Sequence, residues 1–271
     1  MTKILVGTLY SGENEFEECL TSIRNQTHQD FEHFIYKNLP NVEAHHALFS
    51  DFTSKADKFD FLVKVDADMV LCSDQLFANI VNKMSRNPDI DVLSIAVRDF
   101  FTGELINGLN TYRNSVKWDF SKDTMFVDIP EVSRERTFYD QTELAPAAMH
   151  CKNPSKLQSF HYGVHRGLKS IQKIHSTSHW AFIEKTWQNF LKVKDPRIGL
   201  AVLGAELVYA GEFTRSDVDY TNPRLAEMLK KYEAMNYREI KREIIKLRFR
   251  NFGLLPGDWR RRLLRRKYSG I

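Results

Sequence analysis

Two aspartates separated by one alanine are the residues whose type and spacing point most directly to chemistry. Asp66 and Asp68 follow the mostly apolar run 61–65, which is typical of a buried strand. Because residues i and i+2 of an extended segment point the same way, both carboxylates can face one side of the strand end, although a turn there would separate them. Carboxylates this close repel each other, and Mg²⁺ or Mn²⁺, which prefer oxygen ligands, would relieve that repulsion. The pair also fits a simple cap of the next helix or turn.

Three later histidines are further candidate metal ligands. His150 ends the segment 143–150, which reads as a strand, and His161 and His165 are one turn apart on a helix predicted to begin after a cap at either Asn153 or Ser155. Two histidines at this spacing can bind a metal, but without an H-E-x-x-H glutamate they do not indicate a zinc peptidase. Each histidine is equally compatible with a packed or solvated role.

The elements that must position these residues alternate between strand and helix. Apolar periodicity predicts strands at 3–8, 31–36 and 61–65 and helices at 16–23 and 44–52. This order is that of a right-handed parallel α/β sheet. Ligands of such sheets bind beyond the carboxyl ends of the strands, where Thr8, Lys37 and Asp66 would lie together.

Composition indicates a globular protein of a reducing compartment. The chain has 271 residues, of which 42% are hydrophobic and 27% charged, so most of it can fold around a core. No apolar run approaches the roughly 20 residues that span a bilayer, and Met1–Gly7 reads as a first strand rather than a signal peptide. Cys19, Cys72 and Cys151 form no C-x-x-C pair. We therefore expect a cytoplasmic protein without a disulfide scaffold.

The C-terminal segment differs in charge from the rest. From Lys230 onward the chain has 14 Lys and Arg against 4 Asp and Glu, a balance of +10, so the remainder carries −6 within the net charge of +4. Residues 237–249 and 254–267 combine basic side chains with Ile, Leu and Trp. Such a segment can lie among lipid headgroups, which predicts association with an anionic membrane surface, on the inner face of the membrane. The alternative is a helix packed on the core with a solvated basic face.

Three segments near the start carry a family resemblance. Val6–Tyr10 reads G-T-L-Y after its valine, Cys19–Thr27 has the pattern C-L-x-S-I-x-x-Q-T, and Phe31–Ile35 follows. With the D-x-D after them, these segments resemble the opening of family 2 glycosyltransferases of the GT-A fold over the first quarter to third of the chain. Two departures concern nucleotide-base recognition, since Gly7 replaces a usual proline and Lys37–Pro40 replaces a usual Asp-rich loop.

The resemblance implies a fold, a cofactor and a set of site residues. It implies an α/β GT-A (Rossmann-like) nucleotide-sugar-binding fold with a mainly parallel sheet and Mn²⁺ or Mg²⁺ on Asp66 and Asp68. A later histidine would be the third ligand, with His150 the first choice and His161 the second. The expected donor-binding residues are Thr8, Tyr10, Lys37, Lys64, Asp66 and Arg166.

A proton acceptor is needed if the enzyme inverts the sugar's configuration. The family usually supplies one from a Glu-Asp pair, which this chain lacks. Asp140 and Glu143 are the nearest candidates, and each also fits a plain surface charge. Inversion and retention both stay open.

We therefore predict a metal-dependent glycosyltransferase that moves a sugar from a nucleotide-diphosphate-sugar donor to a hydroxyl of a carbohydrate or lipid-linked acceptor. Its expected role is cell-surface polysaccharide or glycolipid synthesis. Residues 1–215 would form the catalytic domain and 216–271 a basic helical C-terminal extension.

Two alternatives come from other classes. A nucleotidyltransferase would open with a basic Gly-rich loop, but Gly7–Gly12 contains no Lys or Arg. A non-catalytic α/β protein would bind nucleic acid through the basic tail. The acidic balance of the main body offers no extended basic face, so nucleic acid is not an expected partner.

Overall fold

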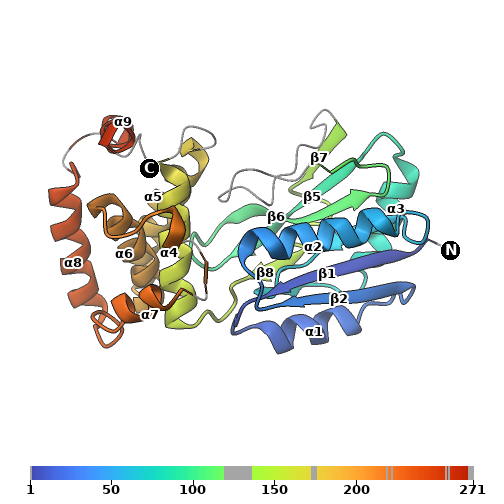
Figure 1. The fold of residues 1–271 in the computed structure, drawn as a ribbon, viewed down its shortest axis with the longest axis horizontal. Helices are drawn as coiled ribbons and strands as arrows, with labels where there is room; N and C mark the ends of the chain where they lie inside the picture. Colours follow the sequence, from blue (N-terminus) through green and yellow to red (C-terminus); the bar gives the residue numbers. More distant parts are fainter. Residues whose placement is uncertain are drawn as a thin grey trace. The chain divides into compact units, whose positions relative to one another are not determined.

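The chain folds into two compact units (Figure 1). The computed structural model describes residues 2–118, 136–171, 176–217, 219–220, 222–253, 255 and 257–267, without the side chains of 176 and 258. Unit 1 comprises residues 1–100 and 104–153, and unit 2 comprises residues 101–103 and 154–271. Packing therefore divides the chain after Asn153, whereas the sequence suggested a boundary after residue 215. The extent of the catalytic domain stays a prediction.

Unit 1 is built on a mixed sheet. Its described strands are β1 (Ile4–Tyr10), β2 (Phe31–Lys37), β3 (Phe61–Lys64), β4 (Met69–Leu71), β5 (Val92–Asp99), β6 (Leu105–Arg113), β7 (Thr137–Asp140) and β8 (Ala148–His150). They lie in the order β2-β1-β3-β6-β5-β8-β4, with β7 beside β5. Four described pairings are parallel and three are antiparallel, so the sheet is mixed, and the predicted α/β class is confirmed.

Helices cover the sheet of unit 1. They are α1 (Phe16–Arg24), α2 (Asn41–Ser54) and α3 (Leu76–Arg86). β1 is buried on both faces, since Ile4, Leu5 and Val6 are all fully buried. Figure 1 shows α2 running alongside β1, and Leu48 of α2 packs in one core cluster with Leu5. A Cβ atom at Gly7 would collide with the Leu48 side chain, so the close approach of α2 accounts for glycine at this position.

Unit 2 is helical within its described residues. Its helices are α4 (Lys156–Ser170), α5 (Ser176–Val193), α6 (Pro196–Ala210), α7 (Pro223–Leu229), α8 (Tyr237–Arg250) and α9 (Gly257–Lys267), with a 3₁₀ turn, η2 (Arg215–Asp217). Ser155 caps α4 in a capping box with Gln158, which confirms one of the predicted helix starts. A Cβ atom at Gly163 of α4 would collide with the backbone carbonyl of Ala201 of α6, so glycine at this position lets the two helices pack backbone to backbone.

The basic tail is joined to the rest of unit 2 by a buried acid. Glu206 of α6 is fully buried, and its carboxylate accepts from Arg248 of α8 at 2.9 Å and from Arg260 of α9 at 2.5 Å. Ile240 and Ile244 of α8 are also fully buried. The tail helices therefore pack on a core, as the alternative interpretation had it, and membrane binding stays a prediction. Leu254, at the start of the basic segment 254–267, lies outside the described residues.

None of the helices in the described ranges is both long enough and apolar enough to cross a membrane.

Candidate metal centre

The two aspartates of the D-x-D are separated by a turn. β3 ends at Lys64, and the Met69 amide donates to the Asp66 carbonyl at 2.9 Å, which closes a turn over residues 66–69. The Asp66 carboxylate accepts from Lys64 Nζ at 2.6 and 2.9 Å. The sequence analysis allowed either an extended strand end or a turn here, and the structure has the turn. Asp66 and Asp68 therefore do not share one face of an extended strand. Among the described residues, the group of candidate metal ligands includes Asp68 but not Asp66.

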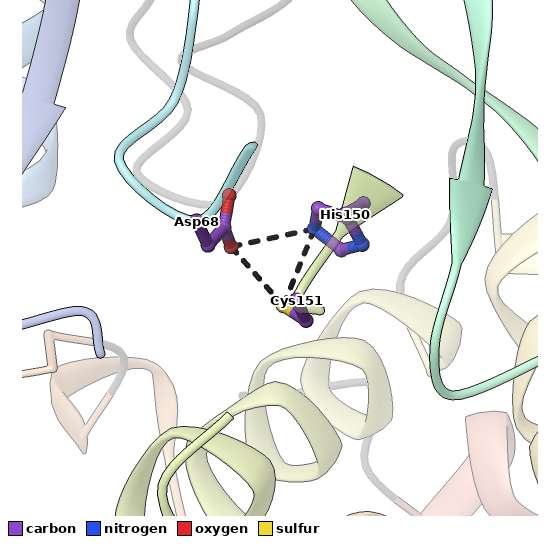
Figure 2. A group of neighbouring side chains, drawn as sticks. All are labelled: Asp68, His150 and Cys151. Atoms are coloured by element: carbon purple, nitrogen blue, oxygen red, sulfur yellow. Dashed lines mark hydrogen bonds and ion pairs between the residues drawn. The ribbon is translucent and has the colours of Figure 1, made fainter. Parts of the chain in front are cut away.

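Asp68 instead faces the end of β8 (Figure 2). Its Oδ2 atom lies 3.4 Å from Nε2 of His150 and 3.3 Å from Sγ of Cys151. Its Oδ1 atom is buried and, within the described residues, has no hydrogen-bond partner. A buried carboxylate oxygen without a donor is destabilising unless another group or ion occupies that position.

The sheet register brings His150 to this place. His150 pairs with Asp99 at the end of β5 and with Met69 at the start of β4. Its imidazole therefore lies between the carboxylates of Asp99 and Asp68. Nδ1 of His150 is 2.7 Å from Oδ1 of the buried Asp99. Because a carboxylate accepts, Nδ1 carries the proton in this pair and Nε2 faces Asp68. The structure thus places His150, the first choice for the third ligand, beside Asp68.

Cys151 completes the group, and the sequence analysis missed it. Its backbone is left-handed (φ 51°), its amide donates to the Asp68 carbonyl at 2.8 Å, and its Sγ is 3.7 Å from Nε2 of His150. This conformation is uncommon for a residue with a side chain and often marks a functional site. The one signal in the sequence was adjacency to a histidine at a strand end, which does not reveal the direction of the thiol.

The charges of the three ligand groups depend on one another. Burial is the largest single influence on Asp68 and disfavours its carboxylate, but the charge of His150, the hydrogen bonds from His150 and Cys151 and the charge of Lys64 together outweigh it and hold the pKa of Asp68 below its usual value. Burial also disfavours the His150 imidazolium, yet the neighbouring acidic groups raise the pKa of His150 well above its usual value. Burial and the charge of Asp68 raise the pKa of the Cys151 thiol well above its usual value. Without a metal the group therefore holds a carboxylate, an imidazolium and a thiol, and a bound cation would displace protons from the last two.

A further acidic residue of this edge, Glu13, was also missed. It follows β1 in the loop before α1, and its carboxylate accepts from the Ser11 amide at 2.6 Å. Burial, followed by the charges of Asp68 and Asp66, raises the pKa of Glu13 to about 7 despite that hydrogen bond. Glu13 stands in a polar loop of the sequence, and nothing in that loop indicates that its carboxylate is partly buried near two other acids.

The loop that carries Glu13 is attached to the segment after Cys151. The Glu15 carboxylate is buried and accepts from the Asn153 amide at 2.7 Å, while the Asn14 side chain donates to the Asn153 carbonyl at 2.7 Å. Lys152 also pairs with Glu18 of α1 at 2.7 Å. These contacts hold the loop after β1 and the loop after β8 together at the same edge of the sheet.

The predicted donor-binding residues of unit 1 lie at or near the ends of β1, β2 and β3. The Thr8 hydroxyl is fully buried and bonds to His33 at 2.9 Å. Tyr10 stacks on Phe16 at 4.0 Å between ring centroids, and Lys37 lies over the same ring at 5.2 Å. The edge therefore carries an aromatic pair and an exposed lysine beside the pair formed by Lys64 and Asp66. Contact of these residues with a donor stays a prediction.

The candidate bases Asp140 and Glu143 lie together in a different part of unit 1. Both carboxylates pair with Lys83 of α3, at 2.7 and 2.5 Å, and Oδ1 of Asp140 accepts from backbone amides of the following turn. Asp140 is buried and pairs with Ile95, four residues before Asp99 on β5, or about 13 Å at 3.3 Å per residue. These contacts give the two residues a structural role, and a catalytic role stays untested.

The remaining predicted residues, His161 and Arg166, are in unit 2 on α4. The ring of His161 stacks on that of His165 at 5.8 Å, and the Arg166 guanidinium lies over the rings of Tyr162 and Phe182 and 3.1 Å from Nδ1 of His179. Their proposed contacts with a metal and a donor are not tested by these distances.

Comparison with known proteins gives remote likenesses. No model of a known protein family matches the chain, and no curated protein matches it. A197 from STIV is similar with a TM-score of 0.34 and 15% identity, over 52% of this chain and 82% of A197. TarS from S. aureus is similar with a TM-score of 0.37 and 12% identity, over 89% of this chain and 55% of TarS. Likenesses of this size do not show a shared activity, so family membership stays a proposal.

Proposed function

We propose that the chain is a metal-dependent glycosyltransferase with a GT-A-like unit 1. It would move a sugar from a nucleotide-diphosphate-sugar donor to a hydroxyl of a carbohydrate or lipid-linked acceptor. The observation that carries this proposal is the group Asp68–His150–Cys151 at the carboxyl-end edge of an α/β sheet, which is where such sheets bind nucleotides. The motifs of the first strand, helix and second strand support the same conclusion.

The residues at this edge of the sheet would have separate roles in binding a nucleotide diphosphate. Asp68 and His150 would hold a divalent cation, and Asp99 would fix the orientation of the imidazole. When bound, the cation supplies positive charge that stabilises the leaving diphosphate. Lys64 keeps Asp66 in place, and Tyr10 and Lys37 offer an aromatic face and a charge for the nucleotide.

Glu13 is the proton acceptor that this arrangement supports best. A general base works best when its pKa is near the working pH, and the pKa of Glu13 is about 7. Glu13 also lies in the loop after β1, which Glu15 and Asn14 attach to the loop after β8 at the same edge of the sheet. Asp140 and Glu143, by contrast, are paired with Lys83.

The tail supports a location at a cytoplasmic membrane surface. Phe249 of α8 and Trp259 of α9 are 69% and 63% exposed, and both helices carry exposed arginines. Such a surface would hold the enzyme near a lipid-linked acceptor of polysaccharide or glycolipid synthesis.

The proposal is tested by a screen of donors. UDP-, GDP-, CMP- and dTDP-sugars are added to the full-length protein with and without a divalent cation, and the melting temperature is measured. A donor at saturating concentration should raise it only when the cation is present, because binding to the folded state stabilises that state. Asp68→Asn should abolish the shift, whereas Asp74→Asn, an exposed carboxylate outside the ligand group, should keep it.

A further inference from the structure

The three ligand atoms of the candidate metal centre have three different chemistries. Asp68 offers a carboxylate oxygen, His150 an imidazole nitrogen and Cys151 a sulfur, and all three lie within 4.8 Å of one another. Mg²⁺ is bound by oxygen atoms, and sulfur is a poor ligand for it. Zn²⁺ is bound readily by all three kinds of atom. The donor set therefore departs from the hard-cation site that the D-x-D motif implies.

The distances also suit a tetrahedral ion. With metal–ligand distances of about 2.0–2.2 Å to oxygen and nitrogen and about 2.3 Å to sulfur, a tetrahedral zinc separates its nitrogen and oxygen ligands by about 3.3 Å and its sulfur from either by about 3.5 Å. The observed separations are 3.4 Å for nitrogen and oxygen, 3.3 Å for sulfur and oxygen, and 3.7 Å for sulfur and nitrogen. The nitrogen–oxygen separation is longer than the roughly 2.7–2.9 Å of a charge-assisted hydrogen bond.

We propose that Asp68, His150 and Cys151 form a three-ligand site for a thiophilic divalent cation of the zinc type, with a fourth position open to water or a donor oxygen. Three protein ligands with one open position are the usual arrangement of a catalytic zinc site. The proposal deepens the proposed function, on which it rests only for the identity of the fourth ligand.

Two features beyond the ligand set point to a bound ion. Within the described residues, Oδ1 of Asp68 is buried without a hydrogen-bond partner; it is the oxygen that does not face His150 and Cys151, so a cation that bound both carboxylate oxygens would satisfy it. Cys151 adopts its left-handed backbone where the amide is bonded to the Asp68 carbonyl, and this holds the thiol beside the carboxylate.

Asp99 adds the outer partner expected of a metal-bound histidine. It is almost fully buried and lies 2.7 Å from Nδ1 of His150, which leaves Nε2 available to a metal. Metal-binding histidines almost always donate their other nitrogen to such a group, and loss of that group typically weakens metal binding by about 10–100-fold.

The test is a cobalt titration of the metal-stripped full-length protein. Co²⁺ occupies zinc sites, and a coordinated thiolate gives it a charge-transfer absorption in the near ultraviolet. We expect this absorption to saturate at one Co²⁺ per chain, to disappear on adding one equivalent of Zn²⁺, and to persist in millimolar Mg²⁺. Cys151→Ser should lose it, whereas Cys72→Ser, which removes an exposed cysteine outside the ligand group, should keep it. Asp99→Asn should keep the absorption but weaken Co²⁺ binding by about 10–100-fold.

The same titration can overturn the proposal. Absence of the absorption in the wild type, its persistence in Cys151→Ser, or displacement of Co²⁺ by Mg²⁺ would each show that Cys151 does not hold a thiophilic ion. A wild-type measurement guards against a variant that fails to fold, since Zn²⁺ but not Mg²⁺ should raise the melting temperature of the native chain. If the chain binds Zn²⁺ but no nucleotide sugar shifts its melting temperature, the zinc-type site stands and the proposed glycosyltransferase activity is rejected. The failure of one proposal can therefore be told apart from the failure of the other.

Discussion

At the scale of single residues, the site depends on groups that carry different charges when alone and when bound to a metal. The imidazolium and thiol of the metal-free group must both lose a proton before they can bind a cation, and only Asp68 is already ionised. Glu13, with a pKa of about 7, changes charge in the physiological range next to them. The residue scale is therefore where pH should act on both stability and rate.

The first prediction concerns the rate. If Glu13 accepts the acceptor's proton, transfer by the wild type should rise with pH and then level off, because the base acts when ionised; the midpoint should lie below the metal-free value of about 7, because the bound cation offsets the charges of Asp68 and Asp66. Glu13→Gln should lower turnover by about 10²–10⁴-fold and remove the rise. A pH–rate profile measures this, with Glu17→Gln, an exposed acid on α1, as the matched control. A rise with pH that survives in Glu13→Gln would assign it to another group.

The second prediction concerns stability and follows from the same pKa. A carboxyl whose pKa is raised on folding binds its proton more tightly in the folded state, so the metal-free protein loses stability as pH increases from 4.5 toward 7. Glu13→Gln removes this loss. Its melting temperature relative to wild type should therefore be higher at pH 8 than at pH 5. An equal difference at the two pH values would contradict the raised pKa.

At the scale of elements, much of the fold could be predicted because local signals decide it. Apolar runs located β1 and β2, and Ser155 was among the residues predicted to cap the start of α4. The site could be predicted only in part. His150 follows from the end of a strand, but the strand order that puts β8 between β4 and β5 depends on long-range pairing.

The parts that could not be predicted depend on backbone geometry at a few positions. A D-x-D reads as extended, yet the turn closed by the Met69 amide sends Asp66 to Lys64 and Asp68 to β8. Cys151 points at Asp68 because of a left-handed backbone that no pattern in the sequence signals. Burial of Glu206 between two arginines likewise depends on three helices distant in sequence.

The third prediction belongs to the contact of α4 with α6. Gly163→Ala places a methyl group against the Ala201 carbonyl, so it should lower the free energy of unfolding by about 1–3 kcal/mol or more. This loss is net of the roughly 1 kcal/mol that alanine gains over glycine within a helix, so the clash itself must cost more than the net loss. Urea denaturation measures the change, with Gly257→Ala as the control because its Cβ would make only an ordinary 3.6 Å contact. A Gly163→Ala protein as stable as the wild type would contradict the close packing.

At the scale of the whole molecule, the arginines of the basic tail fall into two groups. Some arginines of the tail are internal, since Arg248 and Arg260 pair with the buried Glu206. Others are exposed on helices that also carry exposed apolar side chains, and the proposed binding of anionic lipid rests on this composition. Deleting α9 would leave part of the Glu206 charge without its partner, so point variants test the surface better than truncation does.

The fourth prediction is that the tail binds anionic vesicles. Phe249→Ser with Trp259→Ser should reduce co-sedimentation with vesicles of mixed anionic and neutral lipid and leave the melting temperature nearly unchanged, since both side chains are exposed. Binding should also fall with added salt, because each basic residue near such a surface contributes about 1 kcal/mol by electrostatics. Tyr139→Ser, an exposed aromatic of unit 1, is the control. If the wild type, the double variant and Tyr139→Ser co-sediment equally, or if none of them binds the vesicles at low salt, the proposed membrane role is wrong.

The central claim, that this chain is a metal-dependent glycosyltransferase acting through Asp68, is tested most directly by nucleotide release. Full-length protein is incubated with each nucleotide sugar, a divalent cation and candidate acceptors, and the freed nucleotide is measured over time. The account predicts release from one class of donor that stops in excess chelator and returns with the cation. It predicts the same loss in Asp68→Asn and none in Asp74→Asn. Release that continues in chelator, or at the wild-type rate in Asp68→Asn, would contradict it.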